Sequence, residues 1–375
     1  MNLRPPGYEP GELPDCSTPR RSSEYSRARE NEHVRLGVEA AIVGGELVRG
    51  DVEVVDDRVS AVGLESADGR GVAVPGFVDL QVNGFAGVDF LDADTDGYRR
   101  AARALADTGV TAFLPTFVTS PKEQLVAALG ELAQAGASGI LGAHLEGPFI
   151  SSERLGVHSA AARRDPDAAL LKRLLVAGPV RLVTLAPELP GALELISALQ
   201  ERDITVSLGH SNATAAEADA AFELGVRTVT HLFNAMRPFH HRDPGIAGAA
   251  LARDDVFVQA IFDGVHLAAE SEALLWRATR GRLALVTDHT AVAGGRSIDG
   301  TLAGGTTTLI ESVRRLRALG ASLQESVNAG SLIPARILGD PTLGRLEPGL
   351  PADVLVLTDE LEVARVLVGG RDVRG

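Results

Sequence analysis

The stretch "SGILGAHLEGPFIS", residues 138–151, joins an apolar run to a charged end and a Gly-Pro break. The apolar residues are typical of a buried β-strand. Gly147 and Pro148 end the strand, because proline has no backbone N–H to donate to a neighbouring strand. The strand therefore carries an acid, Glu146, at the rim of a hydrophobic core. What this acid does depends on the residues at the ends of the neighbouring strands.

Further runs of the same kind lie on both sides of this stretch. They are "VAVPGFVDL" (72–80), "GVTAFLPT" (109–116), "VRLVTLAP" (180–187), "ITVSLGH" (204–210), "VRTVTHL" (226–232), "VFVQAIFD" (256–263) and "RLALVTD" (282–288). Ala/Leu-rich helical stretches, such as residues 94–109 and 214–225, separate most of them. Continuous apolar runs indicate parallel strands that are covered on both faces. Eight such strands with intervening helices predict an α/β fold, a (β/α)8 TIM-like barrel, with a doubly wound open sheet as the alternative.

The two ends of the chain differ from this middle part. Residues 37–73 and 339–375 show short alternating strands separated by Gly and Asp turns. We expect these two pieces to form one small β-sandwich domain beside a barrel that spans residues 74–338. Residues 1–36 are polar, Pro-rich and Arg/Glu-rich, so they cannot bury enough apolar surface to fold, and we expect a disordered tail.

Composition narrows the classes of function. With 36 Lys and Arg against 50 Asp and Glu, the net charge is −14, whereas a nucleic-acid-binding protein usually has a basic face. The short basic run at 20–29, "RRSSEYSRAR", is better explained as a solvated tail. A single cysteine, Cys16, cannot form an internal disulfide, which favours a reducing compartment. Because the chain lacks a long uninterrupted apolar segment, we expect a cytoplasmic protein with no nucleic-acid or membrane partner.

Polar residues stand at the ends of the strand-like runs, where a barrel of this kind carries its chemistry. These residues are Gln81, Asn83, Glu146, His210, His231, Asp263, His266 and Asp288. A lone histidine at a strand end is usually structural, but an acid and two histidines from separate strands are hard to explain by packing. Burying unpaired charge is costly unless a metal compensates it. We therefore predict that Glu146, His210 and His231 bind one divalent metal, zinc in the first place and iron as the alternative.

Asp288 is the candidate catalytic residue. Three protein ligands leave one metal position free for a water, whose pKa the metal lowers toward neutrality. At the end of the last strand, Asp288 could take a proton from that water and return it to a leaving amine. The alternative is a structural Asp288 that caps a helix or stabilises a turn. Gln81 and Asn83 are candidates to contact the water or to support the ligands from outside.

Several stretches together form a recognisable pattern. They are "PGFVDLQVNGFAGVDF" (75–90), "HLEGPFIS" (144–151), "LGHSNAT" (208–214), "THLFNAMRPFHHRDPG" (230–245), "DGVHL" (263–267), "LVTD" (285–288) and "GTLAGGT" (300–306). In this order the chain resembles the amidohydrolase superfamily, and within it the N-acetylglucosamine-6-phosphate deacetylases, over residues 37–375. "HLFNAM" and "GHSNAT" carry most of the specificity of this resemblance.

The resemblance implies a set of roles. It assigns the metal to Glu146, His210 and His231 and the acid–base role to Asp288. It places substrate contacts on the following residues: His158, Asn234, Ala235, Arg242 and His266. Of these, it assigns the sugar phosphate to Arg242 and His266, and it implies a homodimer that completes each site. The implied reaction hydrolyses the acetamide of an amino-sugar phosphate, with His158 as a candidate to stabilise the oxyanion.

Two departures from the superfamily pattern matter. Gln81-Val82-Asn83 stands where many amidohydrolases carry His-x-His, and amides are poor ligands for transition metals, so one metal is expected instead of two. The segment between Asp288 and residue 300 is shorter than in relatives, and His289 replaces the usual small residue.

Three other functions compete with this prediction, and the sequence argues against one of them. The galactosamine epimer differs from the glucosamine substrate at one hydroxyl, which these motifs do not distinguish. A hydantoinase or dihydroorotase relative would need a lysine to bridge two metals, but the only lysines, Lys122 and Lys172, lie in helix-like stretches. From another class, the chain could be a non-catalytic protein that keeps an amidohydrolase scaffold.

Overall fold

A computed structural model describes residues 33–66, 69–296 and 300–373 of the chain. Residues 1–32 of the expected tail therefore lie outside the described residues. Further along the segment expected as tail (1–36), strand β1 (His33–Arg35) pairs antiparallel with β4 (Asp51–Val55). Such a short strand has no detectable pattern of its own and depends on a partner that is distant in sequence.

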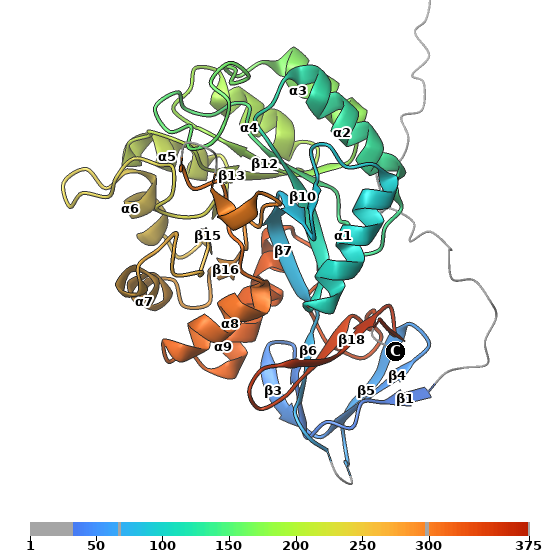
Figure 1. Cartoon of the computed structure of the whole chain (residues 1–375). Helices are drawn as coiled ribbons and strands as arrows, with labels where there is room; N and C mark the ends of the chain where they lie inside the picture. Colours follow the sequence, from blue (N-terminus) through green and yellow to red (C-terminus); the bar gives the residue numbers. More distant parts are fainter. Residues whose placement is uncertain (1–32, 67–68, 297–299, 374–375) are drawn as a thin grey trace, which may run out of the picture.

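The centre of the molecule is a parallel sheet of eight strands in the order β16-β15-β14-β13-β12-β11-β10-β7. Its members are β7 (Phe77–Val82), β10 (Val110–Val118), β11 (Ala143–Glu146), β12 (Val180–Leu185), β13 (Thr205–Leu208), β14 (Thr228–Val229), β15 (Phe257–Ala260) and β16 (Leu283–Leu285). The sheet curls into a nearly closed barrel, which confirms the predicted fold class against the open-sheet alternative (Figure 1).

Helices surround the barrel on its outside (Figure 1). They are α1 (Thr95–Asp107), α2 (Lys122–Ala135), α3 (Ala168–Ala177), α4 (Ala192–Gln200), α5 (Ala215–Glu223), α6 (Gly245–Leu251), α7 (Ala269–Ala278), α8 (Leu309–Ala318), α9 (Leu323–Gly330) and α10 (Leu332–Ile337). Local sequence fixes several helix starts: the Thr214 hydroxyl accepts from Glu217 N while the Glu217 carboxylate accepts from Thr214 N, a reciprocal cap at the start of α5.

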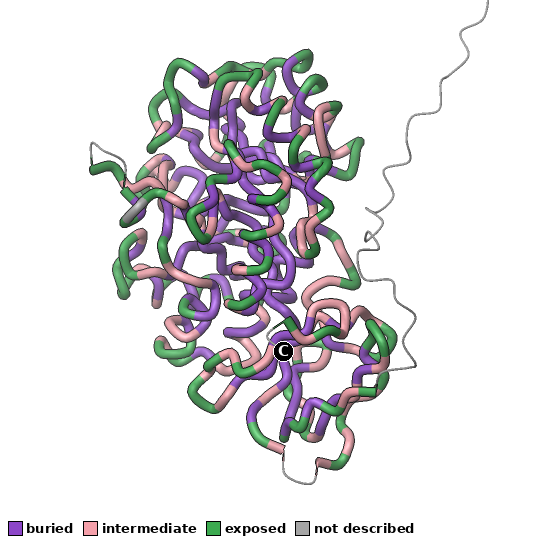
Figure 2. Tube along the Cα trace, turned by 45° about the vertical axis from the view of Figure 1, so that its right-hand side comes forward, coloured by how far each residue is buried: buried purple, intermediate pink, exposed green. Residues whose placement is uncertain are grey.

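Buried residues run through the barrel and its surroundings (Figure 2), and their apolar side chains form the core. Inside the barrel, Val78 and Leu80 of β7 pack in one cluster with Ala284 and with Ile333 of α10. Because α10 packs against both β7 and β16, it covers one end of the barrel. The carboxyl ends of the strands, with the polar residues that follow them, form the other end.

A second, smaller body is built from both ends of the described chain (Figure 1). One sheet has the order β1-β4-β5, with β5 at Arg58–Leu64. The other has the order β19-β18-β17-β6-β2-β3: β19 (Arg371–Asp372), β18 (Val363–Val368), β17 (Val354–Leu357), β6 (Val72–Pro75), β2 (Ala40–Val43) and β3 (Glu46–Arg49). Val52 and Val54 of the first sheet share one buried cluster with Val354 and Leu367 of the second, so the sheets pack face to face.

The remaining elements lie near the open end of the barrel. A two-stranded hairpin, β8 (Gly84–Phe85) and β9 (Val88–Asp89), follows β7. The segment after Asp288 contains a short 3-10 turn, η1 (Ala293–Gly295), and isolated bridges from His289 to Gly305 and from Arg296 to Leu302. Among the helices described, none is both long and apolar enough to span a lipid bilayer.

Candidate active site

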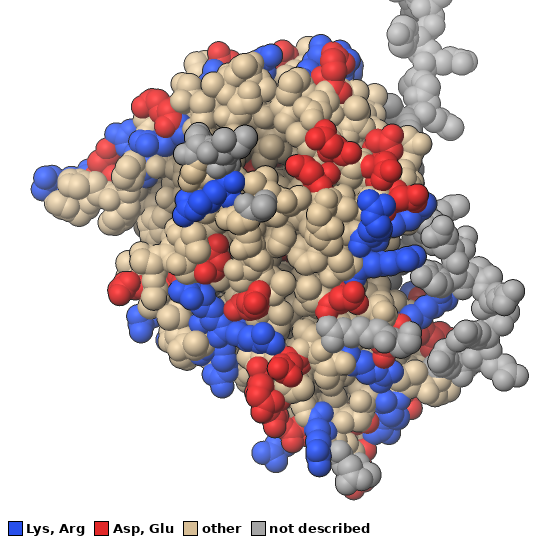
Figure 3. Space-filling view, in the orientation of Figure 1, with Lys and Arg blue, Asp and Glu red and all other residues tan. Residues whose placement is uncertain are grey.

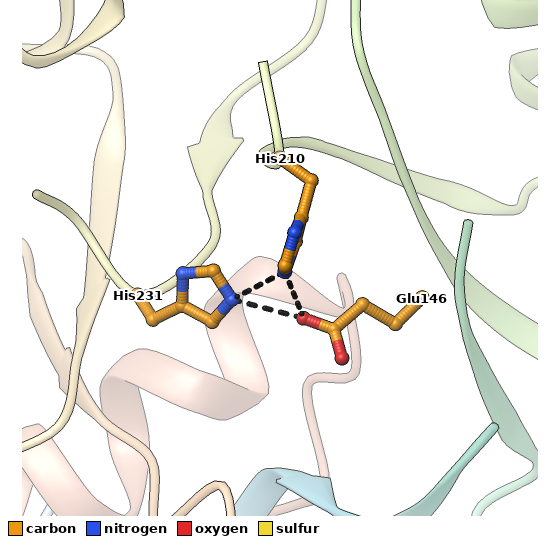
Figure 4. Close-up of side chains that lie close together, drawn as sticks. All are labelled: Glu146, His210 and His231. Atoms are coloured by element: carbon orange, nitrogen blue, oxygen red, sulfur yellow. Dashed lines mark hydrogen bonds and ion pairs between the residues drawn. The ribbon is translucent and has the colours of Figure 1, made fainter. Parts of the chain in front are cut away.

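An acid and two histidines meet at the open end of the barrel (Figure 4). Glu146 ends β11, His210 follows β13, and His231 follows β14. One ligand atom from each lies within 4.8 Å of the others. Glu146 Oε1 is 3.1 Å from His210 Nε2 and 2.9 Å from His231 Nε2, and the two nitrogens are 3.2 Å apart. The structure therefore brings together the three residues that the sequence singled out as ligands.

Unusual backbone conformations direct these side chains inward. His210 (φ 48°), His231 (φ 28°) and Asp288 (φ 48°) all lie in the left-handed region, although none is glycine. Such residues cost free energy and cluster at functional sites, where the surrounding structure holds them. Each one follows the end of a barrel strand, so the backbone turns there and the side chain faces the barrel axis.

The hydrogen bonds of His210 show what the cluster needs. His210 Nδ1 lies 3.0 Å from the carbonyl oxygen of Arg154, which can only accept, so this nitrogen carries the proton. The lone pair of Nε2 then faces Glu146. Burial alone would raise the pKa of Glu146, but the neighbouring imidazoles, first among them the N–H of His158, lower it well below its usual value, so the carboxylate is ionised. An anion and an imidazole lone pair at this distance repel each other unless a cation lies between them.

The donor set therefore fits a divalent metal. One carboxylate oxygen and two imidazole nitrogens are a ligand set that divalent transition metals accept. All three residues are buried, so a cation would also remove the cost of leaving the carboxylate unneutralised.

His158 lies beside this cluster, buried in the loop after β11. Its Nδ1 accepts a hydrogen bond from Thr119 N at 3.2 Å, so in the neutral ring the proton is on Nε2, 3.5 Å from Glu146 Oε2. Burial, and then the nearby His210, lower the pKa of His158 to about 4. His158 is therefore a neutral N–H donor that faces the site.

Asp288 faces the cluster through two amides. Its Oδ1 accepts from Gln81 Nε2 at 3.0 Å and from Asn83 Nδ2 at 2.7 Å, and Gln81 Nε2 also donates to Glu146 Oε1 at 2.8 Å. Burial and the charge of Glu146 raise the pKa of Asp288. Gln81 Oε1 and Asn83 Oδ1 are buried without a partner among the described residues, so two acceptors remain for a water or a substrate N–H or O–H.

Three other expected substrate contacts are His266, Asn234 and Ala235. His266 Nδ1 bonds Asp263 Oδ2 at 2.7 Å, and both side chains are 5% exposed. Burial would raise the pKa of Asp263, but hydrogen bonds from His266 and neighbouring backbone N–H groups lower it, so the carboxylate is ionised. Its hydrogen bond with Nδ1 orients the His266 ring. Asn234 Nδ2 donates to the backbone oxygen of His231 at 3.3 Å, so Asn234 lies beside the cluster. Ala235 has φ 48°.

Arg242 lies apart from the cluster. It is exposed in the loop between Met236 and α6, and within the described chain its hydrogen bonds go only to His240 and His241 of the same loop. This loop protrudes beside α6 (Figure 1), and cationic side chains stand at its outer end (Figure 3). The structure does not bring Arg242 to the cluster of its own chain.

Sequence reasoning missed several residues around the site. The Arg154 carbonyl and the Thr119 N–H fix the protons of two histidines, but backbone groups leave no signal in a sequence. Asp79 and Thr287 also lie beside residues of the site. Asp79 Oδ2 accepts from Thr287 Oγ1 at 2.6 Å, and Asp79 Oδ1 accepts from Gln81 N. The sequence does contain one signal for this pair: Asp79 interrupts the apolar run "GFVDLQV" (76–82).

Comparisons with known proteins agree with this geometry. Residues 72–373 match the Amidohydrolase family. A rat protein named N-acetylglucosamine-6-phosphate deacetylase is 40% identical over 377 residues, covering 87% of this chain and 92% of its own. An N-acetylgalactosamine-6-phosphate deacetylase from Escherichia coli O157:H7 is 34% identical, covering 79% and 86%. A Mycobacterium smegmatis N-acetyl-D-glucosamine-6-phosphate deacetylase mutant, solved in complex with N-acetyl-D-glucosamine-6-phosphate, superposes with a TM-score of 0.86 at 35% identity, covering 91% and 99%.

Proposed function

The chain belongs to the amidohydrolase family, and on this premise we propose that it hydrolyses the acetamide of N-acetylglucosamine-6-phosphate to glucosamine-6-phosphate and acetate. The observation that carries the proposal is the buried cluster of Glu146, His210 and His231, which faces Asp288 across the amide of Gln81. An acid, two lone-pair nitrogens and a second acid at one barrel end suit amide hydrolysis.

Glu146, His210 and His231 would hold one divalent metal, and zinc suits this set of ligands best. When bound, such an ion polarises an amide carbonyl and lowers the pKa of a water. One metal is proposed because Gln81 and Asn83 occupy the position of a second pair of ligands, and their amides already bond Asp288.

Asp288 moves the protons in this proposal. Its Oδ1 is held by the two amides, which leaves Oδ2 to take a proton from the attacking water. The same oxygen then returns the proton to the departing amine nitrogen. The unpartnered amide oxygens of Gln81 and Asn83 are placed to accept from that water or from the substrate N–H.

His158 stabilises the negative charge that develops on the carbonyl oxygen. Its proton lies on the nitrogen that faces the cluster, and it stays neutral near pH 7, so it donates without bringing a net charge into the site. Asn234 and Ala235, which lie close after His231, contact the sugar in this proposal.

The phosphate is bound by His266 and by an arginine from a second copy of the chain. Asp263 holds His266, whereas Arg242 stands on the protruding loop and does not reach its own cluster. A homodimer that inserts this loop into the neighbouring site would supply the guanidinium, which forks onto phosphate oxygens. The single cysteine suits a reducing compartment, so we place the enzyme in the cytoplasm.

An acetate-release assay tests this function. Purified protein is incubated with N-acetylglucosamine-6-phosphate, with the galactosamine epimer and with unphosphorylated N-acetylglucosamine, before and after treatment with a chelator. We expect fastest release from N-acetylglucosamine-6-phosphate, loss on chelation and recovery with zinc. Faster release from the epimer would assign the substrate of the Escherichia coli relative instead. No release from any of them would favour the non-catalytic scaffold.

A further inference from the structure

The barrel has a seam between its first and last strands. β7 and β16 occupy the two ends of the strand order, so no ladder of backbone hydrogen bonds joins them. In the described chain the two sides meet at one isolated bridge, between Val82, the last residue of β7, and His289, which lies beyond the end of β16; there His289 O accepts from Asn83 N at 2.8 Å. Other contacts must hold the seam below this bridge.

Asp79 spans the seam with its side chain. It lies on β7 and is fully buried. Its Oδ2 accepts from Thr287 Oγ1 at 2.6 Å, and its Oδ1 accepts from Thr287 N and Gln81 N, both at 3.2 Å. Thr287 follows β16, so one carboxylate takes the place of the missing backbone hydrogen bonds between the two strands. We call Asp79 and Thr287 the seam clasp.

Packing alone does not explain an acid at this position. Its neighbours on β7, Val78 and Leu80, are apolar and fully buried. Burial raises the pKa of Asp79 to about 7, although hydrogen bonds from Thr287 and Gln81 lower it in part. A buried carboxylate that costs stability indicates a role other than stability.

Both residues of the seam clasp are close in sequence to residues of the candidate active site. Gln81 stands two residues after Asp79, and Asp288 is the next residue after Thr287. Gln81 Nε2 and Asp288 Oδ1 then meet at 3.0 Å. A shift between β7 and β16 would therefore move the base relative to the amide that orients it.

We propose that Asp79 is a positioning residue, which closes the barrel seam through Thr287 and thereby fixes Asp288 against Gln81 and Asn83. The inference rests on the proposed function, since it concerns the same base. The seam is also separate from the proposed metal ligands: Glu146 ends β11, His210 and His231 follow β13 and β14, and none of the three lies on or after β7 or β16. Loosening the seam should affect the base more than the metal.

The test compares Asp79→Asn, Thr287→Val and Thr287→Ser with the control Asp51→Asn. Asp51 is also a buried aspartate that accepts from backbone N–H groups, Val38 N at 3.1 Å and Val52 N at 2.8 Å, but it lies in the small domain. Steady-state kinetics of acetate release, metal content and hydrogen exchange of the peptide that contains residues 286–289 are measured for each variant.

We expect Asp79→Asn and Thr287→Val to lower kcat about tenfold or more while the KM and the metal content stay near those of wild type, because small misplacements of a catalytic group have large effects. Thr287→Ser, which keeps the hydroxyl, should recover most of the loss. Exchange at 286–289 should rise in the first two variants only. Asp51→Asn should keep the wild-type kcat even if it melts earlier.

Unchanged kcat and unchanged exchange in Asp79→Asn, or equal loss in Thr287→Val and Thr287→Ser, would overturn the inference. If Asp79→Asn does not fold, the two Thr287 variants decide. An inactive wild type would reject the proposed substrate, and the exchange measurement would then still decide whether the clasp holds the seam.

Discussion

At the scale of single residues, backbone partners decide what the polar side chains of the site can do. The Thr119 N–H fixes the proton of His158 on the nitrogen that faces the cluster, and the Arg154 carbonyl turns the lone pair of His210 inward. The same ring type therefore presents an N–H donor to the cluster at one position and a lone pair that suits a metal at the other. The two roles predict different consequences of substitution.

Replacing His158 by alanine should leave the metal bound and lower kcat about a hundredfold, because one donor to the developing oxyanion is lost. Replacing His210 by alanine should remove the metal as well. Metal content and steady-state kinetics distinguish the two variants. Loss of metal from His158→Ala would make His158 part of the metal site, against the tautomer inferred from Thr119.

The raised pKa of Asp79 predicts a pH dependence of stability. The folded protein holds the proton of this carboxyl up to about pH 7, whereas the unfolded chain releases it near the ordinary value of 3.8. The folded state thus binds more protons between these values, so stability from this group is present below pH 3.8 and is lost as the pH rises toward 7.

Asp79→Asn removes this titration. The free energy of unfolding of wild type, relative to the variant, should fall by on the order of 1.4 kcal/mol for each pH unit between the two pKa values. Urea unfolding of both proteins at several pH values, with a chelator present so that metal binding does not contribute, measures the difference. A difference that stays constant with pH contradicts the assigned pKa.

At the scale of elements, the strand ends could be predicted from sequence and the loops could not. Continuous apolar runs identified the strands that lead to Glu146, His210 and His231, because parallel strands are buried on both faces. Arg242, whose contact with the phosphate stays a prediction, lies on a protruding loop whose direction depends on tertiary contacts such as the hydrogen bond from Arg237 Nη1 to Asn212 O. β1 was assigned to the tail because its partner, β4, is distant in sequence.

The protruding loop carries the prediction for phosphate recognition. Arg242→Ala should raise KM for N-acetylglucosamine-6-phosphate at least about tenfold and leave the reaction of the unphosphorylated sugar unchanged, because a charged hydrogen bond to phosphate is lost. Arg202→Ala is the control; it removes an exposed arginine side chain whose hydrogen bond in the described chain goes only to Ala198 O. Equal effects on both sugars would show that Arg242 does not bind the phosphate.

At the scale of the whole molecule, the fold follows from patterns that run along the entire chain, whereas the assembly does not. Eight apolar runs with helices between them predicted the barrel, and alternating strands at both ends of the described chain pack as two sheets with a shared core. An interface between copies has no comparable pattern in the sequence. The exposed position of Arg242 is compatible with the proposed second copy.

Mixing two impaired variants, assayed at a substrate concentration well below the KM of Arg242→Ala, tests this assembly. Asp288→Asn lacks the base and Arg242→Ala lacks the phosphate arginine, but in a mixed dimer one site receives Asp288 from one chain and Arg242 from the other. Equal amounts, unfolded and refolded together, should regain about a quarter of wild-type activity, since half of the dimers are mixed and each has one complete site. No recovery, with dimers present, would place Arg242 in the site of its own chain.

The central claim, that Glu146, His210 and His231 bind one divalent ion beside the base Asp288, is tested most directly by measuring metal content and acetate release on the same samples of wild type, His231→Ala and Asp288→Asn. We predict one metal per chain in wild type and in Asp288→Asn, almost no metal in His231→Ala, and a loss of turnover on the order of a thousandfold or more in both variants. Near-normal turnover in Asp288→Asn, or a full metal content in His231→Ala, would contradict the account.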